Sequence, residues 1–125
     1  MGDVLERPKY AAPKPGQIVS DEDVHSAMEF LQRSSHDIGK WRTKSRECEH
    51  MMKITEALEY KMSDGKNDNM RKADARTSAR YQEWATDDAV ACGELAKLYA
   101  LREAASAVVE VYRTQSATLR QAAKL

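Results

Sequence analysis

The sequence predicts an all-α protein built as a long antiparallel helical hairpin, and three observations support this class. Helix-forming residues are abundant, whereas the 125-residue chain holds only one Phe, five Gly and three Pro. Apolar residues recur at intervals of three and four along two stretches of about forty residues each. A polar segment rich in turn-forming residues, at 63–69, separates these two stretches.

The segment 1–19 contains all three prolines, and each proline biases the residue before it away from helix. We therefore expect an extended or disordered arm there, either a leader or an arm that docks on a neighbouring subunit or partner. The segment lacks the apolar stretch of a signal peptide, and no run in the chain is long enough to cross a membrane. We expect a soluble, cytoplasmic protein without membrane contact.

The first helix is predicted over about residues 21–62. Ser20 stands where a helix N-cap is expected, and Asp23 stands where the second member of a capping box would lie. The acidic residues of Asp21–Asp23 would occupy the first turn, where the helix dipole favours negative charge.

The apolar stripe of this first helix shifts by one position near Gly39, where we expect a kink or two abutting helices. Its predicted members are Val24, Met28, Leu31, Ser35, Ile38, Trp41, Cys48, Met52 and Leu58. At 1.5 Å per residue the helix would be about 60 Å long.

A turn is predicted over about residues 63–77, in which 70–77 is either a short helical turn or a loop. A second helix is predicted over about residues 78–123. Its predicted apolar members are Tyr81, Trp84, Ala85, Cys92, Leu95, Leu98, Tyr99, Ala105, Val108, Val109, Tyr112 and Leu119. Both stripes are narrow, which is typical of coiled coils. We expect one domain over 20–125 that oligomerises, most simply as a dimer, into a helix bundle.

The C-terminal stretch VYRTQSATLRQAAKL, residues 111–125, has no acidic side chain, although the formal net charge of the chain is zero. Antiparallel pairing would bring Arg113 and Arg120 beside the acidic turn Asp21–Asp23. These arginines would then either pair with the acidic turn and close the hairpin, or point to solvent beside Tyr112 and form a binding surface.

No enzyme motif is present, so we predict no catalytic residue and no cofactor. The histidines at 25, 36 and 50 would lie about 16–21 Å apart along a helix, too far to share a metal. Glu47 and His50 supply only one of the two Glu-x-x-His pairs that a di-iron bundle needs, so we predict no metal site. Cys48 and Cys92 are predicted to be small core residues.

The zero net charge argues against general binding of polyanions, but one segment is locally basic. Lys40, Arg42, Lys44 and Arg46 surround Trp41, and this mixture is typical of single-stranded DNA binding, where cations hold phosphates and rings stack on bases. The alternative is that the tryptophans pack between the helices and the basic residues are solvated.

The C-terminal half carries a pattern in which an aromatic residue, Tyr112, precedes Arg-Thr-Gln-Ser at 113–116, and Arg120 follows. With Tyr81, Leu98 and Leu101, this pattern makes residues 80–121 resemble a family of small helical proteins of tailed phages and prophages, which usually have Trp in place of Tyr112. Family members are mostly of unassigned function and are encoded near DNA recombination and replication genes.

The resemblance implies a non-enzymatic phage accessory protein in the host cytoplasm, which binds a protein partner or single-stranded DNA during recombination or replication. The predicted binding residues are Tyr112, Arg113, Gln115, Arg120 and Lys124, with a second set at Lys40, Arg42, Lys44 and Arg46. The alternatives are an inhibitor of a host enzyme or defence system and a structural assembly spacer.

Overall fold

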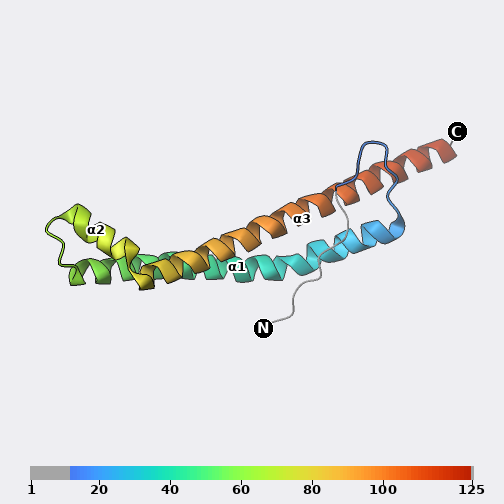
Figure 1. The fold of residues 1–125 in the computed structure, drawn as a ribbon. Helices are drawn as coiled ribbons and strands as arrows, with labels where there is room; N and C mark the ends of the chain where they lie inside the picture. The colour runs from blue at the N-terminus through green and yellow to red at the C-terminus, as the bar shows by residue number, and fades with distance from the viewer. Residues whose placement is uncertain (1–11, 125) are drawn as a thin grey trace. The chain divides into compact units, whose positions relative to one another are not determined.

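The computed structural model describes residues 12–124 and consists of three helices that pack together (Figure 1). They are α1 (Asp21–Met62), α2 (Asp68–Thr77) and α3 (Ala79–Ala123), and the described residues contain no strand. The predicted all-α class is confirmed. Residues 1–11 of the arm expected over 1–19 lie outside the described residues, and residues 12–19 contain no helix or strand.

The start of α1 is fixed by Ser20, as the sequence predicts. The Oγ of Ser20 accepts a hydrogen bond from the backbone N–H of Asp23 at 3.1 Å, and its carbonyl accepts one from Val24 at 3.1 Å. The first bond satisfies one of the N–H groups that a helix leaves open at its first turn, and the second is the first regular i→i−4 bond of the helix. The helix then continues through Gly39 without a break, so the alternative of two abutting helices is wrong.

Helix α2 occupies the segment 70–77, for which the sequence leaves a short helical turn and a loop open, together with the two residues before it. Asn67 caps it, with its side chain accepting a hydrogen bond from the Met70 N–H at 2.9 Å. Ser78 then adopts an extended conformation, with ψ of 148°, and separates α2 from α3. Its Oγ donates to the Ala75 carbonyl at 2.7 Å and accepts from the Tyr81 N–H at 3.3 Å. One serine therefore ends α2 and caps α3.

The connection between α1 and α2 is held by side-chain hydrogen bonds. Ser63 donates to the Asp74 carboxylate and accepts from the Gly65 N–H, while the Nε of Arg71 donates to the Gly65 carbonyl at 3.1 Å. The Tyr60 hydroxyl donates to Asp68 at 2.7 Å. These bonds give the polar backbone of a short loop its partners.

The contacts of the chain group into two units, whereas the sequence predicts one domain over 20–125. Among the described residues, the terminal unit comprises 12–38 and 96–124, and the central unit comprises 39–95. In the terminal unit, Asp21 contacts Tyr112 and Leu31 contacts Arg102, so residue numbers rise along α1 as they fall along α3. In the central unit, Ser45 of α1 contacts Asp88 of α3.

The side chains buried in both units are mostly small. Ala91, Leu98 and Ala105 are buried at intervals of seven residues along α3. The buried residues of α1 are Val24, Ala27, Phe30, Ser34, Ile38, Ser45, Cys48 and Thr55. Small side chains on both helices allow their backbones to approach closely.

Part of the predicted apolar stripe is offset by one residue from the buried one. Ala27 and Ser34 are buried where the sequence predicts Met28 and Ser35, and Met28 is 56% exposed. Likewise Ala91 is fully buried, while Cys92 is exposed. The prediction of a core Cys92 is wrong because neighbouring residues on a helix point about 100° apart. Cys48 is buried as predicted, and this burial raises the pKa of its thiol.

Polar groups between the helices have specific partners. The guanidinium of Arg102 donates to the Leu31 carbonyl at 2.6 Å and to the Ser34 Oγ at 2.7 Å. Ser45 donates to the Asp88 carboxylate at 2.7 Å. The exception is Thr55, whose Oγ1 is buried without a hydrogen-bond partner in the described part of the chain. A buried hydroxyl without a partner costs stability.

Replacing Thr55 with valine is expected to raise the free energy of unfolding by about 1 kcal/mol, because valine fills the same volume without an unpartnered hydroxyl. Urea denaturation followed by circular dichroism measures this change. Thr43→Val is the matched control, since the exposed Thr43 hydroxyl donates to the Gly39 carbonyl at 2.9 Å. A Thr55→Val protein that is less stable than Thr43→Val would contradict the expectation.

Replacing Gly65 with alanine is expected to lower the free energy of unfolding by about 1–3 kcal/mol. A Cβ at Gly65 would lie 2.9 Å from the backbone nitrogen of Arg71 and 3.1 Å from the Cβ of Met70. Gly93→Ala is the opposite control, because nothing lies within 4 Å of its Cβ position inside α3. That change should stabilise by about 0.5–1 kcal/mol, and equal effects at both positions would refute the steric argument.

Candidate functional site

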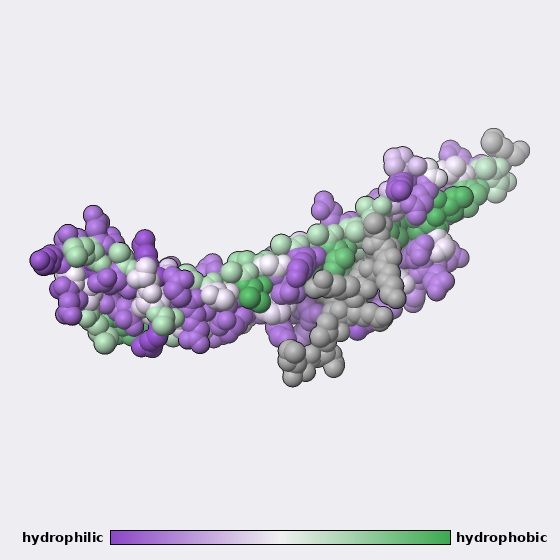
Figure 2. Space-filling view, in the orientation of Figure 1, coloured by the Kyte–Doolittle hydropathy of each residue, from purple (hydrophilic) through white to green (hydrophobic). Residues whose placement is uncertain are grey.

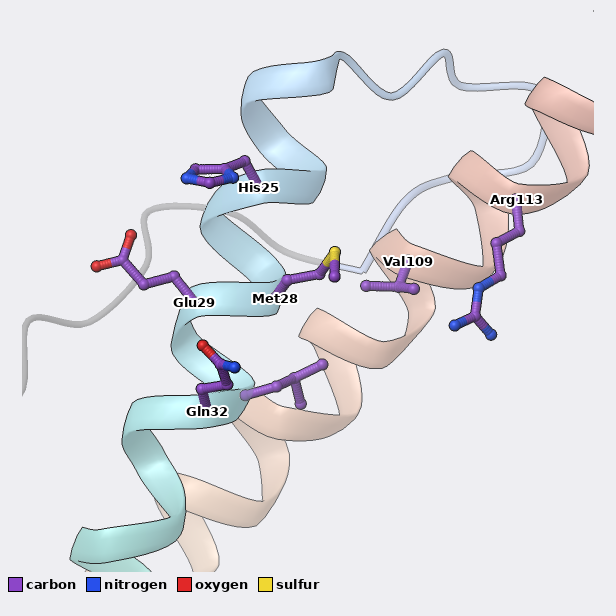
Figure 3. A pocket seen from close by; sticks show the side chains of 7 residues that line it. His25, Met28, Glu29, Gln32, Val109 and Arg113 are labelled. Carbon is purple, nitrogen blue, oxygen red and sulfur yellow. The ribbon is translucent and has the colours of Figure 1, made fainter.

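The terminal unit contains an open groove between α1 and α3, with a cavity volume of about 420 Å³. Figure 3 shows Met28 of α1 and Val109 of α3 pointing toward each other, with Arg113 projecting from α3. The residues that line the groove are His25, Met28, Glu29, Leu31, Gln32, Val109 and Arg113. The groove therefore has an apolar centre and charged residues at its edges.

Exposed apolar side chains continue beyond this groove in the terminal unit. Leu119 is 65% exposed near the end of α3, and Ile18 is 79% exposed before α1 begins. Figure 2 shows hydrophobic surface on the C-terminal part of α3. Exposed apolar side chains that gather in this way mark association surfaces more often than isolated ones do.

Two residues of the predicted C-terminal set join the start of α1 to α3. The Tyr112 hydroxyl donates to Asp21 at 2.7 Å. Gln115 uses both ends of its amide, donating to the Val19 carbonyl and accepting from the Val19 N–H, each at 3.0 Å. Val19 is only 3% exposed. Val19, which lies just before α1, is therefore held against α3.

The arginines of this set do not pair with the acidic turn Asp21–Asp23, so the first of the two alternatives, in which they close the hairpin, is wrong. Arg113 pairs with Glu110 at 3.2 Å, and its side chain is 71% exposed. The Nε of Arg120 donates to the Ser116 carbonyl at 3.4 Å. Long flexible side chains find acceptors one turn away on their own helix, whereas a rigid phenol at Tyr112 reaches across to α1. Arg120 and Lys124 are exposed.

The second predicted set, at residues 40–46, lies in the central unit. The Nζ of Lys40 lies 5.9 Å from the centroid of the Trp41 ring, and the Nζ of Lys44 lies 5.5 Å from that of Trp84. Both tryptophans are half-buried, and Lys44 also lies 3.8 Å from Glu47. These cation–π contacts place lysine heads over rings that bases would need for stacking. Arg42 and Arg46 are exposed.

Sequence reasoning missed the groove residues on α1, His25, Glu29 and Gln32. The sequence would have predicted these residues if the buried stripe had been placed one position earlier. A stripe through Ala27 and Ser34 leaves Met28 at the edge of the contact between the helices. Polar residues on that edge then become the rim of a groove.

Within residues 12–124 no group of three or more His, Cys, Asp and Glu side chains lies close enough together to hold a metal ion. None of the described helices has the length and apolar character that a bilayer span requires. Comparison with protein-family models, with curated proteins and with solved structures found no match in any of the three.

The hydrogen bond to Asp21 raises the pKa of Tyr112 above its ordinary value, because the bond favours the neutral phenol. The folded state thus gains stability from this bond below about pH 10 and loses it as the pH rises through the raised pKa.

Replacing Asp21 with alanine is expected to shift the ionisation of Tyr112 to lower pH, since the carboxylate acceptor is removed. Phenolate absorbance measures this, with Tyr112→Phe subtracted in each background to isolate one tyrosine. Asp23→Ala is the matched control, because it removes an equal charge from the same turn. Identical titrations in the Asp21→Ala and Asp23→Ala proteins would show that the Tyr112–Asp21 bond is absent in solution.

Proposed function

We propose that this chain is a non-enzymatic binding protein that forms a dimer through the groove of the terminal unit and acts by binding another protein. The observation that carries this proposal is the groove itself, where Met28 is 56% exposed beside Val109 and Leu31. A second copy would remove this apolar surface from water, at about 25 cal/mol per Å² buried.

The charges around the groove favour a second copy as its occupant. The α1 edge carries Glu29 and, toward its start, the acidic turn Asp21–Asp23, while the α3 edge carries Arg113 and an acid-free end. A two-fold axis along the groove would place α1 of each copy against α3 of the other. Acidic edges would then meet basic edges, and Arg113 would lie at the level of the acidic turn of the other copy.

The finer architecture that fits this proposal is a coiled-coil hairpin. The buried positions Ala91, Leu98 and Ala105 are spaced by seven residues, and in the terminal unit the contacts pair rising numbers on α1 with falling numbers on α3. Two such hairpins joined at the groove would form a bundle in which neighbouring helices alternate in direction.

The setting proposed for this dimer is that of a phage accessory protein in the host cytoplasm, in DNA recombination or replication. This rests on the resemblance of residues 80–121, which centres on Tyr112, Arg113 and Gln115. An inhibitor of a host enzyme or defence system and an assembly spacer are the competing roles, and capture of partners from infected cells separates them.

We favour a protein partner over single-stranded DNA. The lysines over Trp41 and Trp84 occupy ring faces, and Glu47 neutralises part of the charge of Lys44. Titration of a labelled oligonucleotide at several salt concentrations is the test, since backbone binding must weaken as salt rises. Salt-dependent binding that is lost in a Lys40→Glu, Arg46→Glu protein would favour the DNA role instead.

Replacing Met28 with glutamate is expected to weaken the dimer at least about tenfold, because it places a charge at the centre of an apolar contact. Sedimentation equilibrium over a range of concentrations measures this. Val90→Glu is the matched control, since Val90 is 54% exposed in the central unit and lies outside the groove. A wild-type protein that sediments as a 14.1 kDa monomer at all concentrations would refute the dimer.

A further inference from the structure

We infer that α2 is a movable flap that detaches from the end of α1 and joins α3 as one continuous helix. The joint is Ser78, the single residue between α2 and α3. The flap, the joint and the end of α1 all lie in the central unit. This movement takes place within one chain, so it goes beyond the proposed function and does not depend on the groove of the terminal unit.

Helix α2 is held in place by very little apolar contact. Ala75 is the only buried one among its ten residues, and its largest apolar side chain, Met70, is 47% exposed. Helices in folded proteins are stabilised mainly by the burial of an apolar face against their neighbours. The main interaction that fixes a helix in a fold is therefore weak for α2.

Polar contacts at the surface join α2 to α1. Arg76 pairs with Glu56 at 3.1 Å, with side chains that are 59% and 29% exposed. The Tyr60 hydroxyl donates to Asp68 at 2.7 Å, and the guanidinium carbon of Arg71 lies 5.7 Å from the centroid of the Tyr60 ring. Exposed ion pairs contribute little to stability, because water competes for both partners.

The break at Ser78 depends on one backbone angle. Its φ of −61° is already that of a helix, whereas its ψ of 148° is extended. A rotation of ψ to about −40° would make Ser78 helical and connect α2 to α3. Residues 66–92 contain neither Gly nor Pro, so the sequence on both sides of the joint is compatible with a continuous helix.

The backbone groups at the joint have partners in both conformations. In the bent form the Ala75 carbonyl accepts from the Ser78 Oγ at 2.7 Å, and the Arg76 carbonyl accepts from the Gln82 side chain at 2.6 Å. The Tyr81 N–H donates to the Ser78 Oγ at 3.3 Å. In a continuous helix these carbonyls would accept from N–H groups four residues ahead, and the Tyr81 N–H would donate to a carbonyl four residues behind. Neither form leaves these groups unsatisfied, as two alternative conformations require.

The bent form carries a cost at the level of the joint. Thr55 lies ten residues after Ser45, and Ser78 lies ten residues before Asp88, the residue to which Ser45 donates. Within the central unit α1 and α3 run in opposite directions (Figure 1), so Thr55 lies near the joint. Its buried hydroxyl has no partner among the described residues. Opening of the joint would admit water to this hydroxyl and remove the cost.

The connection to α1 permits the movement. The loop 63–67 is bonded to α2 through Asp74 and Arg71, so the loop and the helix would move together. Its five residues span up to about 17 Å when extended. Detachment would free the face of α1 that carries Glu56 and Tyr60, next to Leu58, which is already 45% exposed. The flap thus controls access to this end of α1.

Pulsed electron spin resonance tests the inference, with nitroxide pairs on cysteines introduced at the exposed residues Ala57 of α1, Ala73 of α2 and Ala89 of α3. Cys92→Ser removes the exposed native thiol, and the buried Cys48 stays unlabelled. Dilution with unlabelled protein excludes distances to a second copy, so the outcome of the dimer test does not affect the measurement.

Ser78→Ala should raise the fraction of the longer 57–73 distance at least about threefold, because it removes the hydroxyl that serves the bent form. Glu56→Gln with Tyr60→Phe should raise it as well, whereas Thr55→Val should lower it. Thr77→Ala is the matched control, since the Thr77 hydroxyl bonds only to carbonyls of its own helix, and it should change the fraction less than about 1.5-fold.

Two further distances separate joining from unfolding. In the Ser78→Ala protein the 73–89 distance should become narrow, with a separation of about 24 Å along the continuous helix. The 57–89 distance should stay unchanged. The inference is overturned if no variant shows a longer 57–73 distance, if Ser78→Ala behaves as Thr77→Ala does, or if the 73–89 distance becomes broad, which would show that α2 unfolds.

Discussion

Small side chains buried between the helices constrain the rest of the structure. Ala27, Ala91 and Ala105 are fully buried, and they bring backbones together while removing little apolar area from water. Polar atoms near such a contact must find partners at short range, as Ser34 does with Arg102 and Ser45 with Asp88. Hydrogen bonds of this kind have strict geometry, so they fix which residues of α1 and α3 can face each other.

Because small residues occupy the interior, larger apolar residues are left at its edges. Met28 lies one position after Ala27, and Ile54 lies one position before Thr55, so each large side chain is rotated about 100° from a buried neighbour. The apolar groove and the exposed apolar side chains of Ile54 and Leu58 are consequences of this arrangement. Association with other helices is the way such a chain can bury the surface that its own fold leaves exposed.

The features that the sequence predicted well depend on neighbours along the chain. The Ser20 cap is determined by a bond to a backbone group three residues away, and the helical class by composition and period. The features that it predicted poorly depend on which of two adjacent residues with similar properties is buried. Ala27 and Met28 are both apolar, and only contact with α3 decides that alanine faces inward. The short helix α2 likewise depends on Asn67 and Ser78, residues that signal a turn and a cap equally well.

The C-terminal site shows the same limit at the level of charge. The basic end of α3 and the acidic start of α1 predict an attraction between them. Attraction between exposed charges is weak, however, and does not determine which side chains make contact. Tyr112 and Gln115 make the joining contacts instead, because a rigid ring and an amide with both donor and acceptor satisfy defined groups on Asp21 and Val19. Arg113 is consequently left at the edge of the groove with a solvent-exposed guanidinium. Because Arg113 does not join α3 to α1 of its own chain, its guanidinium can attract an acidic group on a second copy. This is the role that the dimer proposal gives to Arg113.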